Sequence, residues 1–306
     1  MLNFYQKTIK KEINIEGVGL HNGKAVKVKL IPASPNHGII FKRVDFKDKN
    51  LIPALFKNVS KAVLCTTIEN DFGRKVSTTE HLMGALYGNE IDNLLIEINS
   101  DEMPIMDGSA KYFIDQIKKV GIKTYDTTRK FIKVNKKCEI LKDNKSISIE
   151  PSEQGLHIDF RIIYKNQVIG DQKSSINLMN DDLNEIYNSR TFCLYEDVKK
   201  IKQSGLAKGG SLENAVVVQD DKILNENGLR CKNEFVKHKI LDCMGDLMLS
   251  GHTVLGHIKC EGGGHLLTNE LLRKFFSNRD NFSLVEYKIN KLPKSAIYSD
   301  LVAVSA

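Results

Sequence analysis

His238 and Asp242 stand four residues apart in a segment, residues 233–249, whose spacing of apolar residues predicts a helix. Side chains at this spacing lie one above the other on a single helix face. An imidazole and a carboxylate placed in this way can bind one metal ion without bending the backbone. Asp246 continues the same row by another turn. If a second histidine comes from elsewhere in the chain, the row predicts an open zinc site of the hydrolytic kind.

The predicted helix is amphipathic, with a narrow polar wedge that contains these three side chains and Lys239. One interpretation is that the wedge simply faces water, as it does on most surface helices. A solvated face usually consists of Lys, Glu and Gln, whereas this one stacks His238, Asp242 and Asp246. The helix alone leaves both interpretations open.

A second candidate group of residues precedes another predicted helix, at residues 77–87. Ser77 and Glu80 have the spacing of a capping box, in which each side chain bonds a backbone amide of the first turn. Glu80 is followed at once by His81, so it is also well placed to take a proton from water held by a metal. His81 has a structural alternative as an ordinary buried histidine. His265, after three glycines, is either a surface-loop histidine or a further site residue.

Composition limits the class of protein. The 306 residues are 41% hydrophobic and 27% charged, which is typical of a globular chain long enough for two domains. No apolar run approaches the length of a membrane span, and the first residues lack the apolar core of a signal peptide, so we expect a cytosolic protein. The six cysteines form no C-x-x-C pair and are expected to be free thiols.

The net charge of +7 is modest and scattered, and the sequence contains no Trp. A nucleic-acid-binding protein would concentrate basic charge on one element. The charge balance therefore argues against nucleic acid as a partner. It suits a small anionic substrate better, and it is compatible with transient contact at an anionic membrane surface.

The predicted elements occur twice in a similar order. Each half has strands, a helix, a strand and a helix, so the helix of His81 would correspond to the helix of His238, and two similar domains packed face to face would bring the two histidines to one cleft. A polar stretch at residues 123–129 predicts a linker, which divides the chain into domains at residues 1–125 and 126–306. The second domain carries an insert at about residues 190–230 with no counterpart in the first, and such inserts are often functional.

The predicted elements are a hairpin at residues 13–20 and 26–30 turning at Asn22-Gly23, helices at 77–87, 109–119, 233–249 and 269–276, and strands at 91–98, 131–141, 146–150, 157–164 and 253–260.

Together these runs resemble the zinc-dependent UDP-3-O-acyl-N-acetylglucosamine deacetylases of bacterial lipid A synthesis, over nearly the whole chain. The resemblance rests on GVGLH (17–21), STTEHL (77–82), IDN (91–93), PIMDGSA (104–110), SRTF (189–192), GLA (205–207), GGS (209–211), NE (225–226), GLR (228–230), EFVKHKILDCMGDL (234–247) and GH (264–265).

The resemblance implies an α+β fold of two similar domains, each a small sheet layered with helices and each with an insert, and with the active site in the cleft between them. It implies one Zn²⁺ per chain, held by His81, His238 and Asp242. Glu80 would be the general base, and His265, oriented by Asp246, would protonate the leaving amine. The other implied roles are hydrogen bonding of the oxyanion by Thr191 and substrate contacts by Lys239, Phe192, Leu20 and Gly210.

Some points depart from the family or stay open. Family members often carry a basic residue where this chain has Gly262, which puts one phosphate contact in doubt. The same two histidines and one carboxylate also accept Fe²⁺. The expected partner is a small molecule, UDP-3-O-acyl-N-acetylglucosamine, with no transmembrane segment and a monomeric chain. The alternative function is a non-catalytic, zinc-stabilised module that binds the sugar nucleotide, but such a module needs neither Glu80, Thr191 nor His265.

Overall fold

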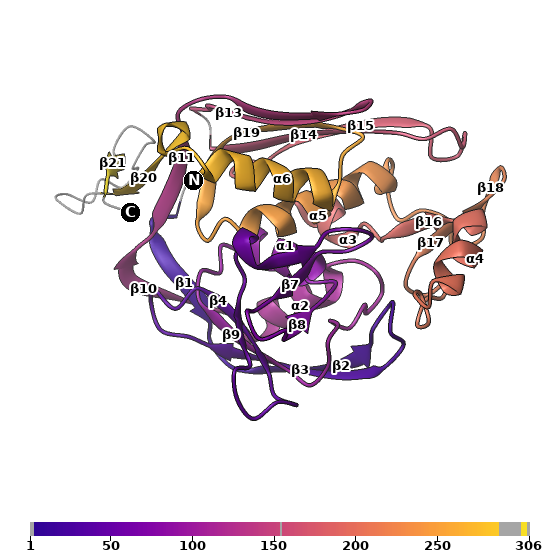
Figure 1. Cartoon of the computed structure of the whole chain (residues 1–306), viewed down its shortest axis with the longest axis horizontal. Helices are drawn as coiled ribbons and strands as arrows, with labels where there is room; N and C mark the ends of the chain where they lie inside the picture. Colours follow the sequence, from indigo (N-terminus) through magenta and orange to yellow (C-terminus); the bar gives the residue numbers. More distant parts are fainter. Residues whose placement is uncertain (1–2, 154, 288–300, 305–306) are drawn as a thin grey trace.

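Two sheets enclose two layers of helices in the computed structural model, which describes residues 3–153, 155–287 and 301–304 (Figure 1). The first sheet has the order β2-β3-β9-β4-β5, in which only the pair β4 and β9 is parallel. Its strands are β2 (Ile13–Val18), β3 (Ala25–Pro32), β4 (Ile39–Arg43), β5 (Leu51–Pro53) and β9 (Leu94–Ile98).

The second sheet repeats this path. β19 (Thr253–Glu261) lies between β13 (Lys145–Glu150), its antiparallel neighbour, and β14 (Leu156–Ile163), its parallel neighbour. β12 (Cys138–Lys142) continues the sheet beyond β13, and β15 (Asp171–Asn177) continues it beyond β14. The order β12-β13-β19-β14-β15 therefore matches β2-β3-β9-β4-β5, both in the order in which the strands follow along the chain and in their relative directions. The predicted repeat of element order is confirmed.

Each sheet buries one face, as the alternation of its residues requires. In β3 the side chains of Val26, Val28 and Leu30 are buried, while Lys27 is exposed. In β14 the buried residues alternate in the same way with partly exposed polar ones. The buried faces pack on α1 (Glu80–Gly88) and α2 (Lys111–Val120) in the first half, and on α5 (Glu234–Met248) and α6 (His265–Phe276) in the second.

Helices α1 and α5 lie against each other at the centre of the molecule, and glycines bring their backbones close. A Cβ on Gly245 would stand 2.1 Å from the carbonyl oxygen of Glu80, and one on Gly84 would stand 2.9 Å from that of Leu241. Only a residue without a side chain fits at either crossing. The first residues of α1 are thereby held directly opposite the middle of α5.

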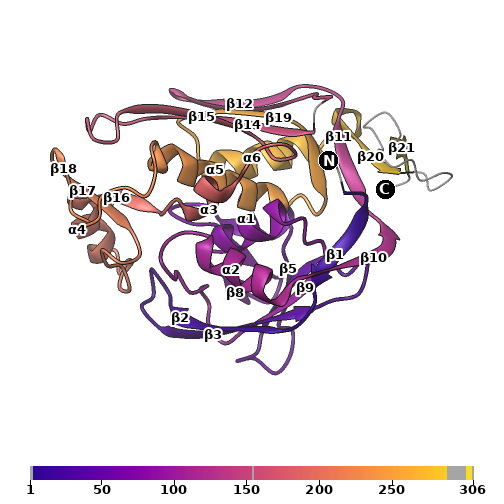
Figure 2. The same cartoon turned by 180° about the vertical axis from the view of Figure 1, so that it is seen from behind.

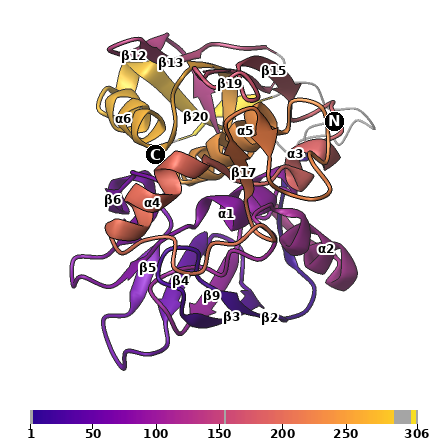
Figure 3. The same ribbon diagram turned by 90° about the vertical axis from the view of Figure 1, so that its right-hand side faces the viewer.

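Both halves carry an insert before their central helix. The first contains η1 (Phe56–Asn58), β6 (Val59–Lys61), β7 (Thr67–Glu69) and β8 (Lys75–Val76), and the second contains α3 (Asn184–Asn188), β16 (Phe192–Leu194), α4 (Tyr195–Gln203), β17 (Val216–Gln219) and β18 (Lys222–Ile223). The segment predicted as an insert, at about residues 190–230, contains a separate small sheet with a helix. It projects beyond the layers in Figure 1 and faces the viewer in Figure 3. The expectation that the first half has no counterpart is wrong, because β6, β7 and β8 occupy the same position in the element order.

The predicted linker at residues 123–129 is wrong. This segment is β10 (Ile122–Thr128), which pairs antiparallel with β1 (Tyr5–Ile9) as a two-stranded ribbon (Figure 2). Among the described residues, neither strand pairs with a further strand. Several side chains of β10 therefore face water, and the strand lacks apolar alternation. The predicted division at residues 125 and 126 falls inside this strand, and the division into two domains stays a prediction.

Smaller differences concern element ends. The strand predicted at residues 131–141 is two strands, β11 (Lys130–Val134) and β12, and α6 begins at His265 rather than at residue 269. Near the C-terminus, η2 (Arg279–Asn281) leads into β20 (Phe282–Tyr287), which pairs with β11 and with β21 (Leu301–Ala303). Among the helices that the structure describes, none has the length and apolar character that a membrane span needs.

Candidate metal centre

The structure brings His81, His238 and Asp242 together, although they come from two helices far apart in the sequence. Nε2 of His238 lies 3.3 Å from Oδ1 of Asp242, and Nε2 of His81 lies 3.6 Å from the same oxygen. One potential ligand atom from each of the three residues lies within 4.8 Å of the others. All three side chains are buried, so the interpretation of the α5 wedge as a water-facing surface is wrong.

The donor set fits a metal ion. Oδ1 of Asp242 is buried and has no hydrogen-bond partner among the described residues, although both imidazoles point a nitrogen towards it. An unpaired carboxylate oxygen in a buried site is costly unless a cation satisfies it. Nδ1 of His238 lies 3.0 Å from the carbonyl oxygen of Ser189, a contact that favours a proton on Nδ1 and a free lone pair on Nε2.

The protonation states of the three groups also suit metal binding. Burial lowers the pKa of His81 to about 3, with a further contribution from the neighbouring His238. Burial likewise lowers the pKa of His238. Burial raises the pKa of Asp242, but the adjacent His238 and Lys239 outweigh it and hold the pKa well below its ordinary value. Metal ligands must be deprotonated, and these groups are deprotonated at neutral pH.

Glu80 lies at the edge of this cluster, on the first turn of α1. Its Oε2 accepts a hydrogen bond from the amide of Thr66 at 3.1 Å, and its Oε1 lies 3.8 Å from Nε2 of His265. Burial raises the pKa of Glu80 to about 7. The predicted capping box is wrong: Thr79 is the N-cap residue and makes no side-chain cap bond, and the hydroxyl of Ser77 pairs with that of Thr67 instead.

His265 faces the cluster from the first residue of α6. Its Nδ1 lies 2.8 Å from Oδ2 of Asp246, one turn beyond Asp242 on α5. Burial lowers the pKa of His265, but the carboxylate of Asp246 outweighs this and the net pKa is raised to about 9. The side chain is buried, so the alternative of a surface-loop histidine is wrong.

The loop before β16 forms another wall of the site. The backbone amide of Thr191 donates to the carbonyl of Gly108 at 2.7 Å, and its carbonyl accepts from Val216 at 2.8 Å, so the residue is held on both sides. The ring of Phe192 meets the ring of His238 edge to face, with the centroids 6.4 Å apart. Nζ of Lys239 lies 2.8 Å from Oδ2 of Asp242 and also stands over the Phe192 ring.

Leu20 and Gly210 lie close together where the first hairpin meets the second insert. A Cβ on Gly210 would stand 3.6 Å from Cδ1 of Leu20, and the amide of Gly209 donates to the carbonyl of Leu20 at 3.0 Å. These two predicted substrate residues come from the two halves of the chain. They therefore join the halves at a second point, apart from the helix crossing.

Several buried polar residues at the site were not predicted from the sequence. Glu234, which has no exposed surface, accepts hydrogen bonds from the amide and the guanidinium of Arg190 at 2.8 to 3.1 Å. Its position four residues before His238, in the same helix row, was an available signal. Thr66 bonds both Glu80 and Asp246, but it lies in a loop where no periodicity marks it.

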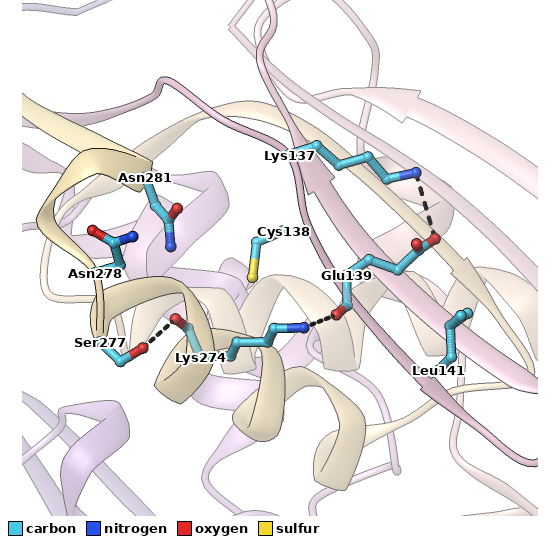
Figure 4. Close-up of a pocket in the computed structure, with 8 residues that line it drawn as sticks. All are labelled: Lys137, Cys138, Glu139, Leu141, Lys274, Ser277, Asn278 and Asn281. Atoms are coloured by element: carbon cyan, nitrogen blue, oxygen red, sulfur yellow. Dashed lines mark hydrogen bonds and ion pairs between the residues drawn. The ribbon is translucent and has the colours of Figure 1, made fainter.

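A hollow at the outer edge of the second sheet contains no predicted site residue (Figure 4). Its polar groups largely satisfy one another. Lys274 donates to the carbonyl of Glu139 at 2.7 Å, Ser277 donates to the carbonyl of Lys274 at 2.8 Å, and Lys137 lies 3.5 Å from the carboxylate of Glu139.

Comparisons with known proteins agree with the resemblance seen in the sequence. The model of the UDP-3-O-acyl N-acetylglycosamine deacetylase family matches residues 6–277. A UDP-3-O-acyl-N-acetylglucosamine deacetylase of Pseudoalteromonas translucida is 41% identical over 275 residues, covering 89% of this chain and 90% of the relative. The protein of the same name from Saccharophagus degradans is 39% identical over 302 residues, covering 98% and 99%. The one from Haemophilus influenzae is 38% identical over 286 residues, covering 92% and 93%.

Proposed function

The chain belongs to the UDP-3-O-acyl-N-acetylglucosamine deacetylase family, and on this premise we propose that it hydrolyses the acetamide of UDP-3-O-acyl-N-acetylglucosamine in lipid A biosynthesis. As a member of that family it is a deacetylase, a hydrolase that acts on an amide. The products would be acetate and the free amine of UDP-3-O-acyl-glucosamine. The observation that carries the proposal is the buried cluster in which a carboxylate, Glu80, and a histidine, His265, flank three metal donors.

His81, His238 and Asp242 would hold a zinc ion, and Fe²⁺ fits the same donors. When bound, zinc lowers the pKa of water towards about 7 and polarises the acetamide carbonyl. The three residues need little rearrangement for this task. Their donor atoms already converge, and Ser189 already fixes the orientation of the His238 ring.

Glu80 would act as the general base. A base is most effective when its pKa lies near the working pH, and burial raises the pKa of Glu80 to about 7. The amide of Thr66 holds one carboxylate oxygen, which leaves the other free to accept a proton from the attacking water.

His265 would protonate the departing amine. An amine leaves an amide poorly unless it receives a proton, and a pKa of about 9 keeps this imidazole protonated at neutral pH. Asp246 stabilises the charged ring through Nδ1, so that Nε2 points towards Glu80 and Asp242, the side on which the substrate would lie.

Thr191 would donate a hydrogen bond to the oxyanion that forms when water adds to the carbonyl. A preorganised donor of this kind contributes on the order of 3 kcal/mol to the stability of the transition state. Lys239 would attract the anionic part of the substrate. Phe192, Leu20 and Gly210 would line the route of the acyl chain, between the second insert and the first hairpin.

The test measures acetate release from UDP-3-O-acyl-N-acetylglucosamine by the purified protein, after the metal has been stripped and after zinc has been added back. Turnover that disappears on stripping and returns with zinc supports the reaction, the substrate class and the metal together. A folded, zinc-loaded protein that binds the sugar nucleotide without releasing acetate would instead be the non-catalytic module.

A further inference from the structure

Thr66 lies in the first insert, just before β7, and its side chain is 2% exposed. Thr66 hydrogen-bonds both Glu80, the proposed base, and Asp246, which orients the proposed acid His265. Resting on the proposed function, we infer that Thr66 is a positioning residue that fixes Glu80 and Asp246 relative to each other. Thr66 is not one of the three metal donors.

The backbone of Thr66 positions Glu80. Its amide donates to Oε2 of Glu80 at 3.1 Å, which orients Oε1 towards His265. Its carbonyl lies 3.4 Å from the amide and from the hydroxyl of Thr79, the residue immediately before Glu80. The loop therefore approaches the start of α1 both at the carboxylate and at the backbone.

The side chain of Thr66 positions Asp246. Its hydroxyl donates to Oδ1 of Asp246 at 2.6 Å, while Oδ2 of the same carboxylate lies 2.8 Å from Nδ1 of His265. With a partner on each oxygen, the carboxylate cannot rotate without breaking a buried hydrogen bond to a charged group, and such bonds are the strong ones. The Thr66 hydroxyl thus indirectly sets the direction of the His265 ring.

This arrangement gives the first insert a task in the chemistry. Glu80 lies on α1, Asp246 on α5 and His265 on α6, so the three groups are held by three different helices. Thr66 joins the first two directly and the third through Asp246. A positioned general acid or base typically contributes about 100- to 10,000-fold to the rate, so loss of a group that orients it should remove part of this contribution.

The experiment replaces Thr66 with Val, which keeps the branched shape and removes the hydroxyl. We expect kcat for acetate release to fall by about 10-fold or more, with KM and the bound zinc unchanged, and we expect Thr66→Ser to restore most of the loss. Thr67→Val is the matched control, because its hydroxyl bonds Ser77 rather than a site residue, and its kcat should stay near that of the wild type. If Thr66→Val does not fold, Thr66→Ala carries the same comparison with Thr66→Ser.

A second measurement separates positioning from general damage. In a His265→Ala background, loss of the Thr66 hydroxyl should change kcat little, because the group that it orients is gone. An equal loss in both backgrounds, or an unchanged kcat in Thr66→Val alone, would overturn the inference while leaving the proposed function in place. A wild-type protein that releases no acetate would remove both.

Discussion

Glu234 and His238 lie one helical turn apart on α5 and bind neighbouring residues of a single loop. Glu234 accepts from the amide of Arg190 at 3.0 Å, and His238 contacts the carbonyl of Ser189 at the same distance. Side chains of α5 therefore bind the loop backbone at two successive residues, Ser189 and Arg190. Thr191, the proposed oxyanion donor, is the next residue of this loop. Its position therefore depends in part on Glu234, which is not among the three metal donors.

The first prediction concerns this buried ion pair. Glu234→Gln should lower the free energy of unfolding by about 3 kcal/mol, because it leaves the guanidinium of Arg190 buried without its counter-charge. Urea unfolding at pH 7 measures the effect. Glu185→Gln is the control, since the Glu185 side chain is 64% exposed and its ion pair with Lys237 should be worth less than about 1 kcal/mol. Equal effects of the two substitutions would contradict the assigned role.

The same pair predicts a pH dependence of stability. Burial raises the pKa of Glu234, but Arg190 and the amide of Arg230 outweigh it, and the net pKa lies below its ordinary value. A carboxylate of this kind stabilises the fold above its unfolded-state pKa, and the contribution is lost as pH falls through the folded-state pKa. The unfolding free energy of wild type should therefore drop towards that of Glu234→Gln as the pH falls below about 4.3. A gap that stays constant down to pH 3 would refute this.

A third prediction concerns metal and stability. Zinc that binds only the folded protein should raise the unfolding free energy by about 4 kcal/mol at a thousandfold excess over its Kd. His238→Ala and Asp242→Ala should abolish most of this gain in a thermal melt with and without zinc. His257→Ala is the histidine control, because its ring lies on the outer face of the second sheet against Asp159 and should leave the zinc effect intact.

A fourth prediction separates chemistry from metal binding. Glu80→Gln should reduce kcat by about 100- to 10,000-fold, because the amide cannot accept the proton of the attacking water. The zinc content, measured by elemental analysis of the same preparation, should remain near one per chain, since Glu80 is not among the three donors. A variant that lost zinc in proportion to activity would place Glu80 among the ligands instead.

A fifth prediction tests the helix crossing. Gly245→Ala should destabilise the protein by about 3 kcal/mol and lower activity as well, since the new methyl group would meet the backbone of Glu80. Gly264→Ala is the control for stability, because it has extended backbone geometry and no atom within 4 Å of the added Cβ. An active, stable Gly245→Ala variant would mean that the helices separate without cost.

The parts of the fold with a periodic pattern could be predicted. α5 and the β2–β3 hairpin were found because the burial of one face leaves a regular spacing of apolar residues. β10 was missed because a two-stranded ribbon buries little, so its residues carry no such spacing. Register and pairing with β1 are set by tertiary contacts that no local pattern contains.

The candidate site divides in a similar way. The i, i+4 row of His238 and Asp242 pointed to metal chemistry through helix geometry alone, and the structure confirms that the donors are buried together. The role of Glu80 was inferred from its place beside His81, those of His265 and Thr191 rested on the resemblance, and all three stay proposals. Thr66 was missed because its role depends on hydrogen bonds to Glu80 and Asp246, which lie 14 and 180 residues away in the chain. No local pattern around Thr66 indicates these partners.

The doubled element order has a consequence for how the protein matures. His81 comes from the first copy of the pattern, and His238 and Asp242 come from the second, so neither copy alone possesses a complete set of donors. During synthesis the set cannot close until residue 242 has emerged and the two copies have met. Metal binding would then follow the packing of the two halves, and only a chain whose halves have already docked could bind the ion.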